Sequence, residues 1–110
     1  TRYTGVNCLG RGVDAWWDAL VARTSGLAPC AFEDVRLPTW LGEVPGLDAV
    51  GLPQALAEFD CRNNRLAFAG LAADGFADAV AAARNRHGAE RVAVILGTST
   101  SGILSTEHAY

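Results

Sequence analysis

The sequence predicts an α/β fold that forms part of a larger layered domain. Residues 63–87 carry apolar side chains at helical spacing on nearly every side, which is typical of a helix buried inside a larger body. Residues 92–96 are an unbroken apolar run that ends at Gly97, which is typical of a central strand covered on both faces. A chain of 110 residues supplies few other elements to cover either one.

The N-terminal part predicts a strand, a turn and a helix. We expect a short strand at residues 2–6 and a glycine-containing turn at residues 7–12. Residues 13–23 are expected to be helical, since apolar side chains share one stripe and acidic residues lie near the positive N-terminal end. Trp16 and Trp17 are expected to be packing anchors, because aromatic side chains mostly serve cores.

The middle of the chain, residues 27–56, contains all four prolines and is predicted to be largely irregular. A short extended segment is expected at residues 39–44. A single helical turn is expected at residues 52–56, where Pro53 suits the first helical position. A connection of this length usually carries a functional surface or lies over a larger body.

The long helix predicted at residues 63–87 can be capped by Asp60 or by Asn63. Gly70 and Gly75 lie in its interior, and each glycine costs about 1 kcal/mol relative to alanine in such a position. We therefore expect close packing at both glycines.

Composition excludes several classes of function. The net charge of -3 argues against a nucleic-acid-binding protein. All nine basic residues are arginine, and without lysine there is no P-loop. No unbroken apolar run approaches the ~20 residues that span a bilayer, so no membrane contact is expected.

The three cysteines, Cys8, Cys30 and Cys61, are sparse and odd in number, which favours reduced thiols in a cytoplasmic protein. Neither the cysteines nor the two histidines have the spacing of a zinc site. We therefore expect no metal and no cofactor.

Arg62 and Arg65 lie one helical turn apart and share a face. Two cations at a helix start oppose its dipole, so an anionic partner would explain them, with simple solvent exposure as the alternative. Cys61 is a weaker candidate as a nucleophile, because a catalytic cysteine needs a base and nothing identifies His87 or His108 as one.

The small-residue loop at residues 97–102 can bind phosphate, line an acyl pocket or simply turn the chain. It contains two glycines, Gly97 and Gly102, and is therefore not a dinucleotide-binding fingerprint, which needs three. The Ser105, Glu107 and His108 side chains form no recognisable catalytic triad.

Several ordered motifs carry a resemblance to a known family. They are Phe59-Asp60-Cys61-Arg62-Asn63-Asn64-Arg65-Leu66-Ala67, Asp74-Gly75-Phe76, Arg91-Val92-Ala93-Val94-Ile95-Leu96-Gly97-Thr98-Ser99-Thr100-Ser101-Gly102 and Thr106-Glu107-His108-Ala109-Tyr110. The segments Tyr3-Thr4-Gly5 and Thr24-Ser25-Gly26-Leu27 add to them. In order and spacing the chain resembles the N-terminal half of β-ketoacyl-acyl-carrier-protein synthases, over nearly its whole length.

The resemblance implies that residues 1–110 are part of the N-terminal half of a thiolase-like layered α/β/α/β/α fold, usually found as a homodimer. It implies an acyltransferase of fatty-acid or polyketide-like biosynthesis that performs a decarboxylative Claisen condensation. Members of the family use a cysteine and two histidines, which are expected beyond Tyr110. Cys61 is not at the nucleophile's place, so no catalytic residue is assigned here.

Three positions match functional positions of that family. Arg62 and Arg65 match basic positions that contact the acyl carrier protein or its phosphopantetheine, and Thr100 matches a position that gates the acyl pocket. Gly75 and the adjacent pair Asn63-Asn64 depart from the family pattern and suggest a divergent subgroup. A non-catalytic, chain-length-factor-like partner subunit of the same fold is the alternative, and an unrelated binding module is a third possibility.

Overall fold

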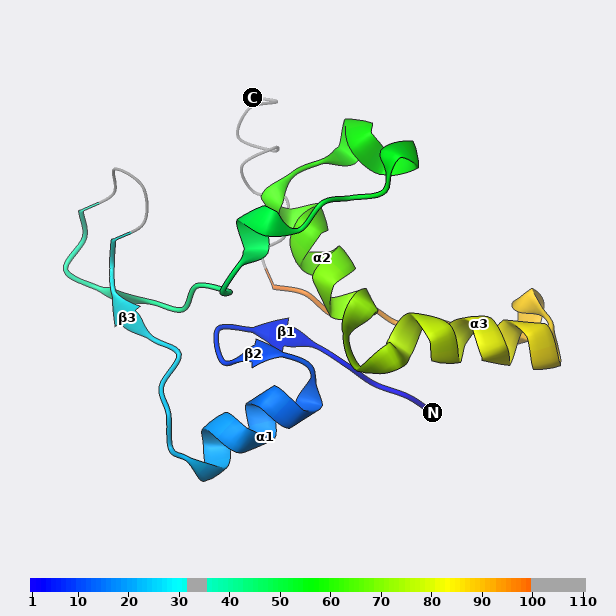
Figure 1. The fold of residues 1–110 in the computed structure, drawn as a ribbon, viewed down its shortest axis with the longest axis horizontal. Coiled ribbons are helices and arrows are strands. Elements are labelled where there is room, and N and C mark those ends of the chain that lie inside the picture. The colour runs from blue at the N-terminus through cyan, green and yellow to red at the C-terminus, as the bar shows by residue number, and fades with distance from the viewer. Residues whose placement is uncertain (32–35, 100–110) are drawn as a thin grey trace.

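Two small hairpins and three α-helices, joined by long irregular segments, make up the part of the chain that the structure describes (Figure 1). The structure is a computed structural model and describes residues 1–31 and 36–99. The strands and α-helices are β1 (Val6–Asn7), β2 (Gly10–Arg11), α1 (Val13–Val21), β3 (Ala28–Pro29), β4 (Trp40–Leu41), α2 (Arg62–Ala72) and α3 (Phe76–His87). The 3₁₀-helices are η1 (Leu47–Ala49), η2 (Gln54–Phe59), η3 (Ala73–Gly75) and η4 (Ala89–Arg91). The predicted mixed α/β character is confirmed.

The first strand is shorter and lies later than predicted, since β1 spans Val6–Asn7 rather than residues 2–6. Strand β1 pairs antiparallel with β2, with Val6 opposite Arg11, so the paired residues fall partly inside the segment expected to be only a turn. The Asn7 side chain accepts a hydrogen bond from the Leu9 amide at 2.8 Å and closes the two-residue turn. Such local bonding is a common property of asparagine in turns.

Helix α1 begins at a buried glycine and is capped by a residue far away in the chain. Gly12 has a φ of 90°, and its amide bonds the Gly5 carbonyl at 2.8 Å. The Asp74 carboxylate accepts hydrogen bonds from the Val13 amide at 3.0 Å and from the Thr4 hydroxyl at 2.9 Å. A carboxylate at this position satisfies an unpaired amide and suits the positive end of the helix dipole.

The two neighbouring tryptophans of α1 differ in environment. The Trp16 indole donates a hydrogen bond to the Gly10 carbonyl at 3.0 Å, and its ring packs against Gly5. Trp17 is 66% exposed. The predicted role as a packing anchor is therefore confirmed for Trp16 and wrong for Trp17 within the described residues.

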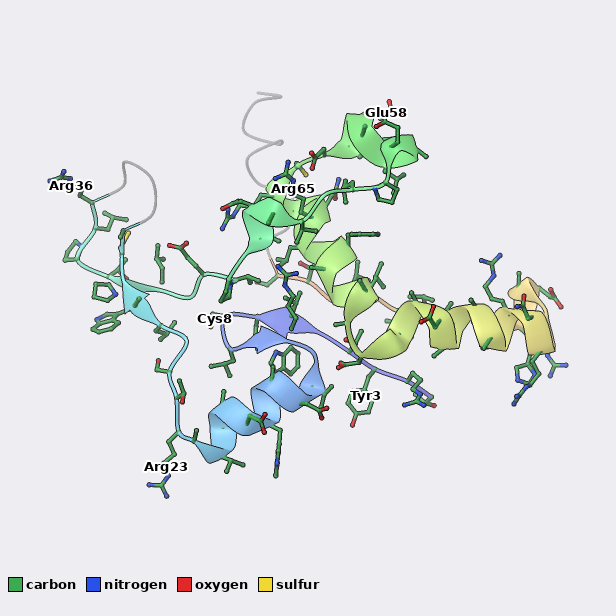
Figure 2. The ribbon with its side chains drawn as sticks, in the orientation of Figure 1. Tyr3, Cys8, Arg23, Arg36, Glu58 and Arg65 are labelled. Carbon is green, nitrogen blue, oxygen red and sulfur yellow. The ribbon has the colours of Figure 1, made fainter. Side chains whose placement is uncertain are left out.

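Cys8, at the tip of the first hairpin, connects it to the second (Figure 2). The Cys8 sulfur packs against Gly26 and Gly42. A Cβ added at Gly26 would lie 2.8 Å from this sulfur and one added at Gly42 would lie 2.7 Å from it, so a larger residue at either position would collide with the thiol. These glycines flank strands β3 and β4, which pair antiparallel. The extended segment predicted at residues 39–44 contains β4. The helical turn predicted at residues 52–56 is found as η2, Gln54–Phe59, with Pro53 as its N-cap rather than its first helical residue.

The long helix predicted at residues 63–87 is two helices that meet at a corner (Figure 1). Asp74 and Gly75 have φ values of 55° and 63°, a left-handed backbone that ends α2 and starts α3. Close packing is confirmed at Gly70, where a Cβ would lie 3.3 Å from the Val6 side chain. It is wrong at Gly75, which has open space around it and serves as the N-cap of α3.

The described residues bury few of their own apolar side chains. Leu47 and Ala69 are the buried hydrophobic residues in the described ranges. The chain exposes 8791 Å², whereas a compact folded protein of its mass would expose about 5,800 Å². Its radius of gyration is 16.4 Å, compared with about 13 Å for a compact domain of this length. The described residues thus leave most of their large apolar side chains exposed or half-exposed.

Residues 92–98 extend away from η4 without a strand partner in the described part of the chain. Ile95 is 93% exposed, and Val94 and Leu96 are also exposed. The described residues therefore do not contain the covered central strand predicted at residues 92–96.

By length and composition alone, Arg62–His87 is apolar enough to cross a membrane, with a mean hydropathy of 1.4 in its most apolar window and 6% of that window buried. The left-handed corner at Asp74 interrupts it. In hydrocarbon such a break leaves backbone groups without partners, and an aspartate at mid-depth is costly. This geometry favours burial against protein.

Candidate partner-binding site

Arg62 and Arg65 lie in the first turn of α2, as their places in the sequence predict. The N-cap of α2 is Cys61, whose side chain makes no capping hydrogen bond. The prediction that Asp60 or Asn63 is the cap is therefore wrong. Asp60 instead binds an arginine of the same turn, Arg65.

Both arginines have carboxylate partners within the chain. Arg62 Nη1 lies 2.7 Å from Asp48 Oδ1, in a pair whose side chains are 43% and 83% exposed. Arg65 makes a two-pronged contact with Asp60, with N–O distances of 2.6 Å and 2.7 Å, and also donates to the Asp48 carbonyl at 3.2 Å. The two cations at the helix start are thus offset by nearby acids, and an external anion is not needed to explain them.

The Arg65 guanidinium lowers the pKa of Asp60 below its ordinary value of 3.8, chiefly through their hydrogen bonds. The charged carboxylate is therefore favoured in the folded state. Because the folded pKa is the lower one, the pair stabilises the fold above the unfolded pKa and stops doing so as the pH falls through the folded value.

Replacing Asp60 with asparagine should consequently reduce stability at neutral pH, and this reduction should shrink as the pH falls below 3.8. Urea unfolding midpoints of both proteins, measured from about pH 6 to about pH 2, test this. Glu43→Gln, at an exposed position with no ion pair in the described ranges, is the matched control. A difference that stays constant across the acid range would contradict the assignment.

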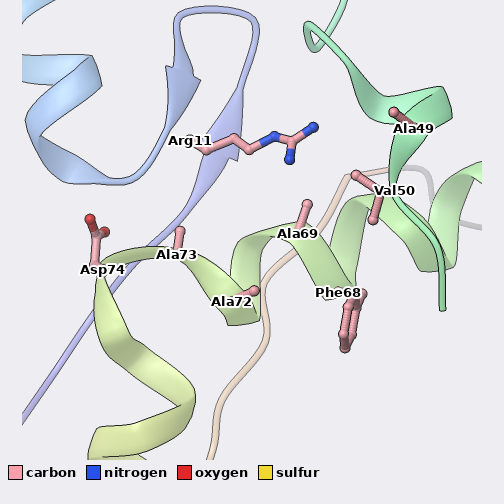
Figure 3. A pocket seen from close by; sticks show the side chains of 8 residues that line it. All are labelled: Arg11, Ala49, Val50, Phe68, Ala69, Ala72, Ala73 and Asp74. Carbon is pink, nitrogen blue, oxygen red and sulfur yellow. The ribbon is translucent and has the colours of Figure 1, made fainter. Parts of the chain in front are cut away.

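A shallow groove with a volume of about 430 Å³ lies along the C-terminal half of α2 (Figure 3). Its floor is made by small side chains of successive helical turns, Ala69, Ala72 and Ala73. Val50 and Phe68 add apolar surface. Alanines leave the helix surface low, which explains the hollow at this point.

Two charged residues, Arg11 and Asp74, line the groove. Arg11 reaches across from β2 and donates through Nη2 to the carbonyls of Pro45 and Gly46, at 3.2 Å and 2.9 Å. Asp74 lies at the corner between α2 and α3, where it caps α1 (Figure 3). Arg11 thus ties β2 to the segment before η1.

The 3₁₀-helix η1 contacts both the groove and the two arginines of α2, Arg62 and Arg65. Asp48 binds Arg62 and Arg65, while the next residues, Ala49 and Val50, line the groove. The arrangement places three arginines and three aspartates around a small apolar hollow, so its positive charges are balanced by carboxylates.

Asp74 is the one carboxylate among the residues that line the groove, and it accepts hydrogen bonds from the Val13 amide and the Thr4 hydroxyl; no cysteine, serine, threonine or histidine lines the groove. The part of the chain that the structure describes contains no cluster of residues able to hold a metal ion. Cys61 is exposed at the N-cap of α2. Thr100, the predicted acyl-pocket residue, lies outside the described residues, and so do Ser105, Glu107 and His108.

Three residues of the site, Arg11, Asp48 and Asp74, were not predicted from the sequence. Arg11 and Asp48 lie in segments without periodicity, and their partners are distant in the sequence. For Asp74 a signal was present, because Asp-Gly is a common turn dipeptide and predicts a chain reversal.

Comparisons of the chain with protein-family models, with curated proteins and with solved structures gave no match.

Proposed function

We propose that this chain is the N-terminal part of a β-ketoacyl-acyl-carrier-protein synthase with a thiolase-like layered fold. The observation that carries the proposal is the order of its motifs, from Asp60-Cys61-Arg62-Asn63-Asn64-Arg65 through the apolar run at residues 92–96 to the loop at residues 97–102. The apolar surface that the described residues leave uncovered supports it, because such surface is expected where a sheet and helices of a larger domain pack.

In this proposal the complete protein is a cytoplasmic acyltransferase that acts as a homodimer. An acyl group passes from carrier protein to a cysteine thiolate. Malonyl-carrier protein loses CO₂, and its carbanion attacks the acyl thioester carbonyl and expels the thiolate. The cysteine and its two histidines would follow Tyr110, and residues 1–110 would contribute the carrier-protein contact and one wall of the acyl pocket.

The complete protein that contains this chain, purified and incubated with acyl- and malonyl-carrier protein, should release CO₂ and form the 3-oxoacyl product. Substituting the downstream cysteine of a small-residue turn should abolish product. A complete protein that lacks such a cysteine and forms no product would instead support a chain-length-factor-like partner subunit. Product formation that survives loss of every downstream cysteine would contradict the proposed chemistry.

Arg62 and Arg65 are proposed to contact the acidic carrier protein, in addition to their pairing with Asp48 and Asp60. The double variant Arg62→Glu/Arg65→Glu should weaken carrier-protein binding about tenfold or more at low salt, because opposite charges become like charges. Binding is measured by titration calorimetry on the complete protein.

Two variants separate contact from structural pairing. Asp48→Asn/Asp60→Asn removes the internal carboxylates and should leave binding equal or tighter, since it frees the guanidinium groups. Arg23→Glu/Arg36→Glu reverses two other exposed charges and should have little effect. Unchanged affinity in the Arg62→Glu/Arg65→Glu variant would remove the carrier-protein assignment.

Thr100 is proposed to gate the acyl pocket. Replacing it with phenylalanine should shift the preference of the complete enzyme toward shorter acyl chains, because a larger side chain fills pocket volume. Relative kcat/KM values for acyl-carrier proteins of increasing chain length measure the shift. An unaltered preference would remove Thr100 from the pocket.

A further inference from the structure

The C-terminal end of α3 concentrates positive charge. Arg84, Arg86 and His87 belong to its last turn, and Arg91 ends the following 3₁₀-helix η4. We refer to these four residues as the basic end of α3. One third of the chain's nine arginines lie here, although the whole chain has a net charge of -3.

The arginines of the basic end lack carboxylate partners in the described ranges. Arg84, Arg86 and Arg91 are exposed and take part in no ion pair or side-chain hydrogen bond there. Glu90 is the acidic residue of this segment, and its carboxylate lies against Gly88. Arg62 and Arg65, in contrast, are each paired with an aspartate.

The helix dipole accounts for part of this charge. A helix C-terminus carries the equivalent of about half a negative charge, and one cation already offsets it. Further arginines within the same short segment repel one another. Three arginines and a histidine against one acidic residue, Glu90, are therefore more positive charge than the helix end requires.

The basic end is also the part of α3 that stays at a surface. The apolar sides of the helix favour coverage by protein, whereas burying unpaired guanidinium groups is costly. All four residues of the basic end are exposed in the structure. Surfaces of a single charge steer and select partners of the opposite charge.

We propose that the basic end of α3 is a docking surface for an acidic protein. Charge complementarity selects the partner. The proposal rests on the proposed function for the partner's identity, which is then the acidic acyl carrier protein. It adds a second contact, separated from Arg62 and Arg65 by α2, the corner at Asp74 and the length of α3, which is about 18 Å.

The test uses the complete protein that contains this chain. Arg84→Glu/Arg86→Glu/Arg91→Glu is compared with a control of equal charge change, Arg2→Glu/Arg23→Glu/Arg36→Glu, whose three positions are also exposed. Apo acyl carrier protein is titrated against each at about 50 mM salt, where charges are weakly screened. A milder variant, Arg84→Gln/Arg86→Gln/Arg91→Gln, and circular dichroism melting of every variant identify any loss of folding.

The basic-end variant should weaken carrier-protein binding about tenfold or more, and the glutamine variant should weaken it less, with the control nearly unchanged. Equal weakening in variant and control, or unchanged binding in both basic-end variants, would overturn the proposal. Tighter binding of a duplex DNA or of anionic lipid vesicles than of carrier protein would overturn it as well.

Condensation is assayed on the same preparations. If the unsubstituted protein forms no 3-oxoacyl product, the proposed function fails, while the comparison of binding between the two charge-reversed variants still decides the docking surface.

Discussion

Replacing Gly12 with alanine should destabilise the fold by about 3 kcal/mol, the sum of a strained backbone and a lost helix cap. Gly12 is buried and has a φ of 90°, which side chains other than glycine's rarely adopt. An added Cβ would lie 3.0 Å from the Asp74 Cγ and would push this carboxylate away from the Val13 amide. Strain and loss of the cap thus arise from one methyl group.

Urea unfolding midpoints measure this loss, with Gly51→Ala as the control. A methyl group at Gly51 would have nothing within 4 Å of it, so that variant should change little. Replacing Asp74 with glycine in the Gly12→Ala protein removes the clash, so the two substitutions together should cost less than the sum of their separate effects. If the losses of stability in the two single variants simply add in the double variant, the clash with the Asp74 carboxylate is not the cause of the effect of Gly12→Ala.

Gly5→Ala should cost about 2 to 3 kcal/mol because it overpacks a fixed contact. A Cβ at Gly5 would collide with the Trp16 ring and lie 2.7 Å from its Cζ2. The backbone cannot easily retreat, since the Gly5 carbonyl accepts the Gly12 amide. The ring cannot easily move either, since its indole nitrogen is bonded to the Gly10 carbonyl.

The cost of Gly5→Ala should depend on the Trp16 ring. Trp16→Leu removes the ring and should recover part of the stability that Gly5→Ala loses, whereas Trp17→Leu at the exposed neighbour should recover none. Unfolding midpoints of the single and double variants give the coupling energy. Equal behaviour of the two tryptophan variants would mean that the Trp16 ring does not set the cost.

Elements specified by local pattern were predictable from the sequence. Helix α1 was expected from residue 13 and begins there, because its apolar spacing and its acidic first turn are properties of neighbouring residues. The corner between α2 and α3 was missed because apolar spacing continues through it. At Asp74-Gly75 the turn preference of the dipeptide prevails over that spacing.

The candidate site also combines features that the sequence predicts with features that it does not. The shared face of Arg62 and Arg65 follows from their helical spacing, which the sequence displays. Their partner Asp48 comes from a different segment, 14 residues before Arg62, and the contact of Arg11 with Gly46 spans 35 residues. Such pairings depend on how irregular segments pack, and no periodic pattern encodes them.

The bond between Asp74 and the start of α1 has a consequence for the order of folding during synthesis. The Val13 amide and its acceptor are 61 residues apart in the chain. At about 5 to 20 residues per second, a ribosome adds that stretch in roughly 3 to 12 seconds. During this interval the first helix has been made but its cap has not. The N-terminal hairpin and α1 are therefore completed by a residue that emerges much later, and the first helix is secured only when the α2–α3 corner arrives.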